Sequence, residues 1–414
     1  MKMEFADGDG DIASSSTTLA IRAKSIITMA DEEPARAAQL FAPLKKIDNG
    51  VLLVRDGLVA DVLPWDDASL PAETQIRDVG PVCLIPACVN AHVHLELSHL
   101  AGKTCWGKGF VPWLESLIAL LHVSPDAERI ADACADMSCA GTLYAGNVTG
   151  SLPGGMAMAD AASREAGLIV RHFCEWFGFG APYVDSERPW PPRCRAYVTT
   201  HAATAAYSAP AGHALYSTGP DVLAAAHADC VRMGRVFSLH LAESPEETEL
   251  LTSGGGPLRQ LYDTIVLPRD WSPPGLRPLA YAMKLGLLSP GTLAVHGVQL
   301  DAQEIDVLAA SGAALCLCPR SNHNLGVGLP LLRVMMESGC LLCLGTDGLT
   351  SNHSLDVRQE AIWLRETFDV PPEALIRLLT VNGAAALNLM ECGAGRLERG
   401  CPANFCVLPE ELTY

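Results

Sequence analysis

Residues 90–96 read Asn-Ala-His-Val-His-Leu-Glu and follow an apolar segment that runs from residue 82 to residue 89. Side chains two residues apart on a strand point to the same face, so His92 and His94 can bind one ion together. Imidazole nitrogen is a good ligand for zinc and for ferrous iron. The same sequence could also be two polar residues at the end of a strand that bind no metal. The rest of the chain has to decide between these two interpretations.

The chain between about residues 84 and 389 alternates between short apolar runs and amphipathic segments. Helical patterns follow most of the runs, for example at residues 221–233, 301–311 and 329–338. About eight strand–helix units over about 300 residues predict a (β/α)8 barrel. A doubly wound open sheet could use the same units, but no Gly-x-Gly-x-x-Gly follows the first strand. The expected strands are residues 82–94, 141–148, 168–176, 205–213, 236–241, 292–296, 313–318 and 340–345.

The two ends of the chain have a different sequence pattern, which predicts short strands separated by turns. Asp56-Gly57 lies between two apolar runs and predicts a hairpin, and the last residues are again strand-like. Neither end buries much surface alone, so we expect them to pair into one small β-sandwich. The predicted organisation is a disordered or loosely attached segment 1–17, a sandwich formed by 18–86 and 390–414, and a barrel over 87–389.

The composition excludes several classes of partner. The net charge of −18 argues against nucleic acid and anionic membranes, which need basic patches. No window has the eighteen apolar residues of a spanning helix, and residues 1–18 lack the apolar core of a signal peptide. We therefore expect a cytoplasmic protein with reduced thiols. Cys340 and Cys343 are expected to be buried core thiols rather than a zinc or redox pair.

Polar side chains that suit chemistry gather where the expected strands end. Active sites of (β/α)8 barrels lie at this end of the strands, so the coincidence points to one site. Each residue alone could instead be a capping carboxylate, a hydrogen-bonded histidine or a solvated acid. The residues are His92, His94, His213, His240, Glu243, His296 and Asp347.

These motifs resemble the amidohydrolase superfamily, and more narrowly its mononuclear-metal aminohydrolase branch. The resemblance is carried by N-A-H-x-H-L, H-L-A-E, the isolated His296, L-G-T-D and a terminal G-x-L-x-x-G-x-x-A-x-F segment. It implies metal ligands and a proton carrier, Glu243. It also implies a helper beside the attacking water, His296, and a histidine against the substrate, His213. The implied metal ligands are His92, His94, His240 and Asp347.

The resemblance also bears on the number of metal ions. Binuclear relatives bridge two ions with a carbamylated lysine at the end of the fourth strand. This chain has no lysine between Lys108 and Lys284. We therefore expect one divalent ion per chain, zinc in the first place and iron as the alternative.

Hydrolytic deamination explains why such residues belong together. A divalent ion lowers the pKa of its water toward 7. Asp347 can touch the metal and also accept the water proton. Glu243 can protonate the ring nitrogen next to the attacked carbon and then help ammonia to leave. The alternative for Glu243 is a helix N-terminal carboxylate, since Ser-Pro-Glu-Glu follows it. The alternative for His296 is a structural histidine whose ring nitrogens are hydrogen-bonded inside the barrel.

The substrate is expected to be an adenine-bearing nucleoside. H-x-H-L-E-L-S and C-P-R-S-N resemble the aminodeoxyfutalosine deaminases of the alternative menaquinone pathway. They favour 6-amino-6-deoxyfutalosine, which gives futalosine. S-adenosylhomocysteine, methylthioadenosine or adenosine deamination is the alternative, and a triazine-type chlorohydrolase is another. A non-catalytic barrel is disfavoured because every implied ligand is present. A homodimer is left open.

Three further residues are candidate substrate contacts. In the S-adenosylhomocysteine/methylthioadenosine group, a Trp followed nine residues later by a Glu contacts the ribose. Here Trp113 is followed at that distance by His122. Glu96 could accept the sugar hydroxyls instead, or could orient a metal-bound histidine. Arg320 is a candidate partner for a substrate carboxylate.

Overall fold

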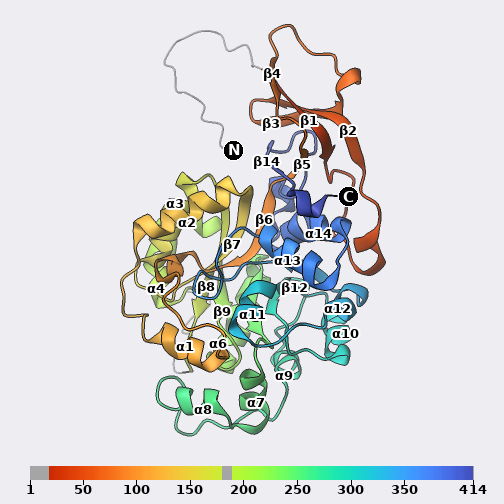
Figure 1. The fold of residues 1–414 in the computed structure, drawn as a ribbon. Coiled ribbons are helices and arrows are strands. Elements are labelled where there is room, and N and C mark those ends of the chain that lie inside the picture. The colour runs from red at the N-terminus through yellow and green to blue at the C-terminus, as the bar shows by residue number, and fades with distance from the viewer. Residues whose placement is uncertain (1–17, 180–188, 414) are drawn as a thin grey trace.

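The computed structural model describes residues 18–179 and 189–413 (Figure 1). The segment 1–17, expected to be loosely attached, lies outside the described residues. No helix in these two ranges is both long enough and apolar enough to cross a membrane.

Eight parallel strands form the centre of the molecule in two groups of four, ordered β6-β7-β8-β9 and β10-β11-β12-β13. All eight are largely buried, which is why their sequences read as nearly continuous apolar runs. Their bounds are β6 (Cys88–Val93), β7 (Thr142–Thr149), β8 (Ile169–Trp176), β9 (Ser208–Gly212), β10 (Phe237–Leu241), β11 (Thr292–His296), β12 (Ala314–Leu317) and β13 (Leu341–Leu344).

Backbone hydrogen bonds at the ends of these strands join the two groups into a closed barrel. On one side the amide of His240 donates to the carbonyl of His213 at 3.0 Å. On the other side the amides of Thr346 and Asp347 both donate to the carbonyl of His92 at 3.1 Å. Helix α6 packs on β9 and β10, and α15 packs on β13 and β6, so each seam is covered by a helix. The predicted (β/α)8 barrel is confirmed.

Helices connect the strands and enclose the barrel (Figure 1). Local signals set many of their ends. Helix α10, for example, begins with a capping box between Asp301 and Glu304 and ends at Gly312, which has φ 77°. The helices are α1 (Phe110–Ile118), α2 (Ala127–Cys139), α3 (Gly155–Glu165), α4 (Pro192–Thr200), α5 (Ala202–Ala206), α6 (Pro220–Met233), α7 (Pro245–Ser253), α8 (Pro257–Tyr262), α9 (Pro278–Lys284), α10 (Ala302–Ser311), α11 (Pro319–Leu325), α12 (Leu332–Glu337), α13 (Arg358–Phe368), α14 (Pro372–Leu379) and α15 (Val381–Ala386).

Two expected elements differ from the structure, and a proline explains each difference. The expected strand 82–94 is two strands, because the chain leaves the small sheet at Pro86 and enters the barrel at Cys88. The helix expected over 329–338 begins only at Leu332. Pro330 disfavours helical geometry in the residue before it, which shortens the helix at its start.

Strands from both ends of the chain form a second sheet beside the barrel, at the top of Figure 1. Strand β14 pairs antiparallel with β5, where Cys406 lies opposite Ile85. Ile21, Leu52 and Leu84 belong to the apolar core of this region. The domain boundaries given above remain a proposal. The strands are β1 (Thr18–Ile27), β2 (Lys46–Arg55), β3 (Leu58–Pro64), β4 (Gln75–Asp78), β5 (Cys83–Pro86) and β14 (Phe405–Val407).

Cys343 lies in strand β13 and Cys340 directly precedes it. Both residues are fully buried in the core. Their sulfur atoms lie near the carbonyl oxygens of Ile305 and Leu315, respectively. They are buried core thiols, as the sequence predicted.

Candidate active site

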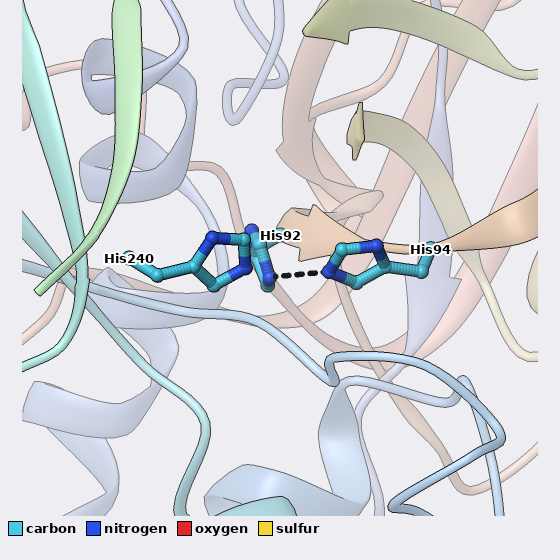
Figure 2. Close-up of side chains that lie close together, drawn as sticks. All are labelled: His92, His94 and His240. Carbon is cyan, nitrogen blue, oxygen red and sulfur yellow. Dashed lines mark hydrogen bonds between the residues drawn. The ribbon is translucent and has the colours of Figure 1, made fainter. Parts of the chain in front are cut away.

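Three histidines from two strands converge at the end of the barrel where the strands terminate. His92 and His94 come from the end of β6, and His240 comes from β10 on the other half of the barrel (Figure 2). One ring nitrogen from each of the three lies within 4.8 Å of the others. The Nε2 atoms of His92 and His94 are 3.2 Å apart and point toward each other.

Asp347 completes this group from the loop after β13. Its Oδ1 lies 3.4 Å from Nε2 of His94 and 3.7 Å from Nε2 of His92. Its Oδ2 accepts hydrogen bonds from the hydroxyls of Ser321 and Ser351, each at 2.7 Å. The residue has φ 58°, a left-handed conformation that is uncommon for aspartate. One oxygen is therefore held by serines while the other faces the histidines.

The chemistry of this donor set fits a divalent cation. Burial lowers the pKa of His92 to about 4 and that of His94 to about 3, so both rings are neutral and carry a lone pair. Nδ1 of His240 donates to the carbonyl of His213 at 2.7 Å, which leaves Nε2 free to bind. Three neutral imidazoles and one carboxylate oxygen are typical zinc ligands.

Glu243 and His296 lie beside the histidine cluster. Nε2 of His296 is 3.6 Å from Oε1 of Glu243, and Nδ1 of His296 is 3.1 Å from the side-chain amide of Asn322. Because the amide nitrogen can only donate, Nδ1 accepts and the ring proton sits on Nε2, toward Glu243. Burial raises the pKa of Glu243 well above its usual range, and repulsion by Asp347 and Glu247 adds to the rise. Glu243 can therefore carry a proton at neutral pH.

A cavity of about 430 Å³ opens onto these groups. Its polar lining includes His94, His240, Glu243, His296 and Asp347. The ring of His213 also borders it, with Nδ1 held 2.5 Å from Oγ of Ser217. Helix α1 supplies an apolar wall through Phe110, Trp113, Leu114, Leu117 and Ile118. This lining suits a polar ring against the histidines and carboxylates and an apolar substituent against α1.

The site lies in a region whose sequence matches a known family. The profile of the amidohydrolase family matches residues 83–413. The chain belongs to the amidohydrolase family. As its motifs predicted, this amidohydrolase is a hydrolase of the class that acts on carbon–nitrogen bonds in cyclic amidines.

Known proteins similar to this amidohydrolase include one relative by sequence and two by structure. A 5-methylthioadenosine/S-adenosylhomocysteine deaminase of Nitratidesulfovibrio vulgaris is 30% identical over 389 residues, covering 87% of this chain and 80% of the relative. Aminofutalosine deaminase of Helicobacter pylori, in complex with methylthio-coformycin, superposes with a TM-score of 0.77 and 20% identity, covering 94% and 91% of the two chains. A zinc-bound adenosine deaminase of Xanthomonas campestris gives a TM-score of 0.73 and 22% identity, covering 94% and 84%. The two structures show that the fold is shared.

Two expected substrate contacts lie away from the cavity of the amidohydrolase. Glu96 is buried, and its carboxylate accepts from the Thr149 hydroxyl at 2.9 Å and from the Ser151 amide at 2.7 Å, so it is not available to a sugar. Arg320 turns toward Glu360, whose carboxylate is 3.7 Å from its Nη1. Both residues secure loops near the site. Trp113 does border the cavity, but its indole N–H donates to the Thr350 carbonyl at 2.8 Å, so it offers an apolar ring.

Two charged residues that border the cavity were missed by the sequence analysis. Glu175 is the penultimate residue of β8 and is 7% exposed, and burial raises the pKa of its carboxyl well above the usual range. The strand-end argument did not single it out, because it lies inside the expected strand 168–176. Arg193 in α4 borders the cavity and contacts the carbonyls of Gly150 and Ser151. Nothing in its local sequence distinguishes it from a surface arginine.

Proposed function

We propose that this amidohydrolase replaces the exocyclic amine on the adenine ring of a nucleoside with oxygen, releasing ammonia. The observation that carries the proposal is the pairing of Glu243 with His296 beside a cluster of metal-ligating side chains, inside one cavity. The deaminase of Nitratidesulfovibrio vulgaris, which matches 87% of this chain, supports the same chemistry.

In this proposal His92, His94, His240 and Asp347 hold one divalent ion, with zinc preferred and iron as the alternative. The donor set and the zinc-bound relative of similar fold support this assignment. A bound ion would supply a water of lowered pKa as the nucleophile.

The remaining steps use the side chains of the chain itself. Asp347 Oδ1, which is free of the serine hydroxyls, takes a proton from the attacking water. Glu243 donates its proton to the ring nitrogen next to the amine-bearing carbon, then takes the proton of the new hydroxyl and passes it to the departing amine. Asp347 then releases its proton to solvent, and Glu243 regains one from solvent. The Nε2–H of His296 orients the oxygen that replaces the amine. One water is consumed, the C–N bond breaks, a carbonyl forms and ammonia leaves.

For the substituent on the sugar we propose an apolar group that ends in a carboxylate, as in 6-amino-6-deoxyfutalosine. Helix α1 offers an apolar wall, and Arg193 borders the same cavity. Arg193 thus replaces Arg320 as the candidate partner of the carboxylate. A methylthioadenosine/S-adenosylhomocysteine deaminase is the second candidate, favoured by the relative that covers 87% of this chain.

A triazine-type chlorohydrolase is less well supported. Chloride can leave without being protonated, whereas the amine must gain a proton before it leaves as ammonia. A buried carboxyl with a raised pKa next to the reacting atoms is therefore of more use to a deaminase.

An ammonia-release assay of the zinc-loaded protein tests these proposals. Aminodeoxyfutalosine, methylthioadenosine, S-adenosylhomocysteine, adenosine and guanine form the panel. We expect the highest kcat/KM with aminodeoxyfutalosine. A higher kcat/KM with methylthioadenosine or S-adenosylhomocysteine would instead identify the protein as a methylthioadenosine/S-adenosylhomocysteine deaminase. Absence of ammonia from every compound, at one metal ion per chain, would refute nucleoside deamination.

A further inference from the structure

Neither of the two positions from which an acidic sugar contact was expected presents an available carboxylate to the cavity. The carboxylate of Glu96 is engaged by Thr149 and Ser151. Position 122, nine residues after Trp113, is a histidine on the surface. A ribose bound in the cavity needs hydrogen-bond acceptors for its hydroxyls, because burying them without partners costs free energy. The acceptors must come from elsewhere on the cavity wall.

Three acidic residues border the cavity within the described ranges: Glu175, Glu243 and Asp347. Under the proposed function, Glu243 and Asp347 handle protons at the reacting end. Glu175 has no such task. It is buried and held in register at the end of β8, where it lies opposite Ala211 of β9.

The contacts of Glu175 leave it able to accept hydrogen bonds from a ligand. Its Oε1 lies 3.4 Å from Nδ1 of His240, but that nitrogen already donates to the carbonyl of His213 at 2.7 Å. The carboxylate, a ring nitrogen of His213 and one of His240 lie within 4.8 Å of one another. Glu175 and His213 therefore flank the same part of the cavity.

The order of residues around the barrel matches the order of atoms around an adenine nucleoside. Glu243 follows β10, His213 follows β9, and Glu175 ends β8, which is the next strand. In adenine, the nitrogen next to the amine-bearing carbon is followed around the ring by a second nitrogen, and then by the position that carries the sugar. With the first nitrogen at Glu243 and the second near His213, the sugar lies toward Glu175.

We propose that Glu175 recognises the ribose, its carboxylate accepting hydrogen bonds from the two neighbouring sugar hydroxyls. A carboxylate has two oxygens with several lone pairs and so suits a pair of hydroxyl donors. The inference rests on the proposed function, and it makes Glu175 a specificity residue that distinguishes ribose from deoxy sugars.

Comparing adenosine with 2′,3′-dideoxyadenosine in wild type and Glu175→Gln tests this. For wild type we expect kcat/KM about 10- to 100-fold higher with adenosine, the range for two buried hydrogen bonds. Glu175→Gln should lower kcat/KM for adenosine by that factor, mainly through a higher KM, and leave kcat/KM for dideoxyadenosine almost unchanged. Glu175→Asp, which keeps the carboxyl group, should retain part of the preference.

Controls separate this role from support of the fold or of His240. Zinc content and Tm are measured for each variant, and Glu96→Gln serves as a matched buried carboxylate off the cavity. Glu96→Gln is expected to affect both nucleosides alike. The proposal is wrong if Glu175→Gln and Glu175→Asp lower kcat/KM for both nucleosides equally, or change it for neither.

A binding measurement keeps this question apart from catalysis. Calorimetry with inosine and 2′,3′-dideoxyinosine reports sugar recognition even if no ammonia is released. Tighter binding of inosine to wild type, lost in Glu175→Gln, would support the proposal although deamination had failed. Equal binding of the two inosines by wild type, or no binding of either, would overturn it.

Discussion

Glu243 shows how the surroundings of one side chain determine its chemistry. A glutamate in water is ionised at neutral pH and cannot serve as an acid. Here burial and the nearby Asp347 raise the pKa of Glu243, which favours its protonated form, and its Oε1 lies 3.6 Å from Nε2 of His296. The backbone amide of Glu243 donates to Glu247 at 2.8 Å, which fixes the residue in place.

Glu243→Gln removes the transferable proton while keeping the size of the side chain. We expect kcat to fall roughly 10²- to 10⁴-fold, the usual contribution of a positioned acid–base group, with zinc content unchanged. Steady-state kinetics and metal analysis check this, with Glu249→Gln, exposed on the helix α7 that follows Glu243, as the control. A fall of less than about tenfold would remove Glu243 from the proton-transfer role.

Ser321 and Ser351 determine which oxygen of Asp347 faces the histidines. Partners of this kind typically change metal affinity about 10- to 100-fold when removed. We expect the double variant Ser321→Ala/Ser351→Ala to weaken zinc binding by that order, because Asp347 is then free to rotate. Competition with a chelator measures the affinity, and Ser253→Ala on the surface is the control. Unchanged affinity would show that the serines do not position Asp347.

At the scale of elements, the strand ends are what made the site predictable from the sequence. A buried strand is apolar, so a polar residue at its end stands out, as His240, His296 and Asp347 do. Glu175 was missed because apolar Trp176 and Phe177 follow it and mask the end of the strand. Such a pattern identifies which residues leave a strand, but not which neighbours they meet.

Side-chain direction after a strand could not be predicted in the same way. Residues Leu95–Leu100 form a short 3-10 helix directly after His94, and this turns Glu96 toward Thr149. Arg320 likewise lies in the first turn of helix α11, and its backbone amide donates to Glu360, which is 40 positions further along the chain. Both outcomes depend on contacts distant in sequence, which local patterns do not encode.

The start of helix α7 links stability to pH. Glu247 is buried, and its pKa is raised to about 7 from an ordinary 4.5, chiefly by burial. As pH rises from 4.5 to 7, the unfolded chain loses this proton before the folded chain does. The free energy of unfolding therefore falls between pH 4.5 and 7, because the contribution of the protonated Glu247 is lost, by roughly 3 kcal/mol at most.

Glu247→Gln removes this titration while retaining an acceptor for the Glu243 amide. We expect the variant to gain stability relative to wild type as pH rises from 4.5 to 7. Urea unfolding at several pH values measures the difference, and Glu249→Gln, exposed on the same helix, is the control. A difference that does not change with pH would contradict the raised pKa.

At the scale of the whole molecule, the site and the closure of the barrel involve the same residues. The carbonyl of His92 accepts the amides that join β13 to β6, and the amide of His240 joins β10 to β9. The side chains of His92, His94 and His240 then meet across the barrel (Figure 2). A cation bound by them would connect both halves of the barrel. The helices α6 and α15 cover the same two seams from outside.

Zinc should therefore stabilise the entire fold and not only the site. At a free concentration a hundred times its Kd, a ligand that binds only the folded state adds about 2.7 kcal/mol. We expect the Tm of the chelator-treated protein to rise with added zinc until one ion is bound per chain. His240→Ala should abolish most of this rise, while His227→Ala, which pairs with Ser289 away from the site, should keep it. An equal rise in both variants would place the ion elsewhere, and a plateau at two ions per chain would overturn the single-ion assignment.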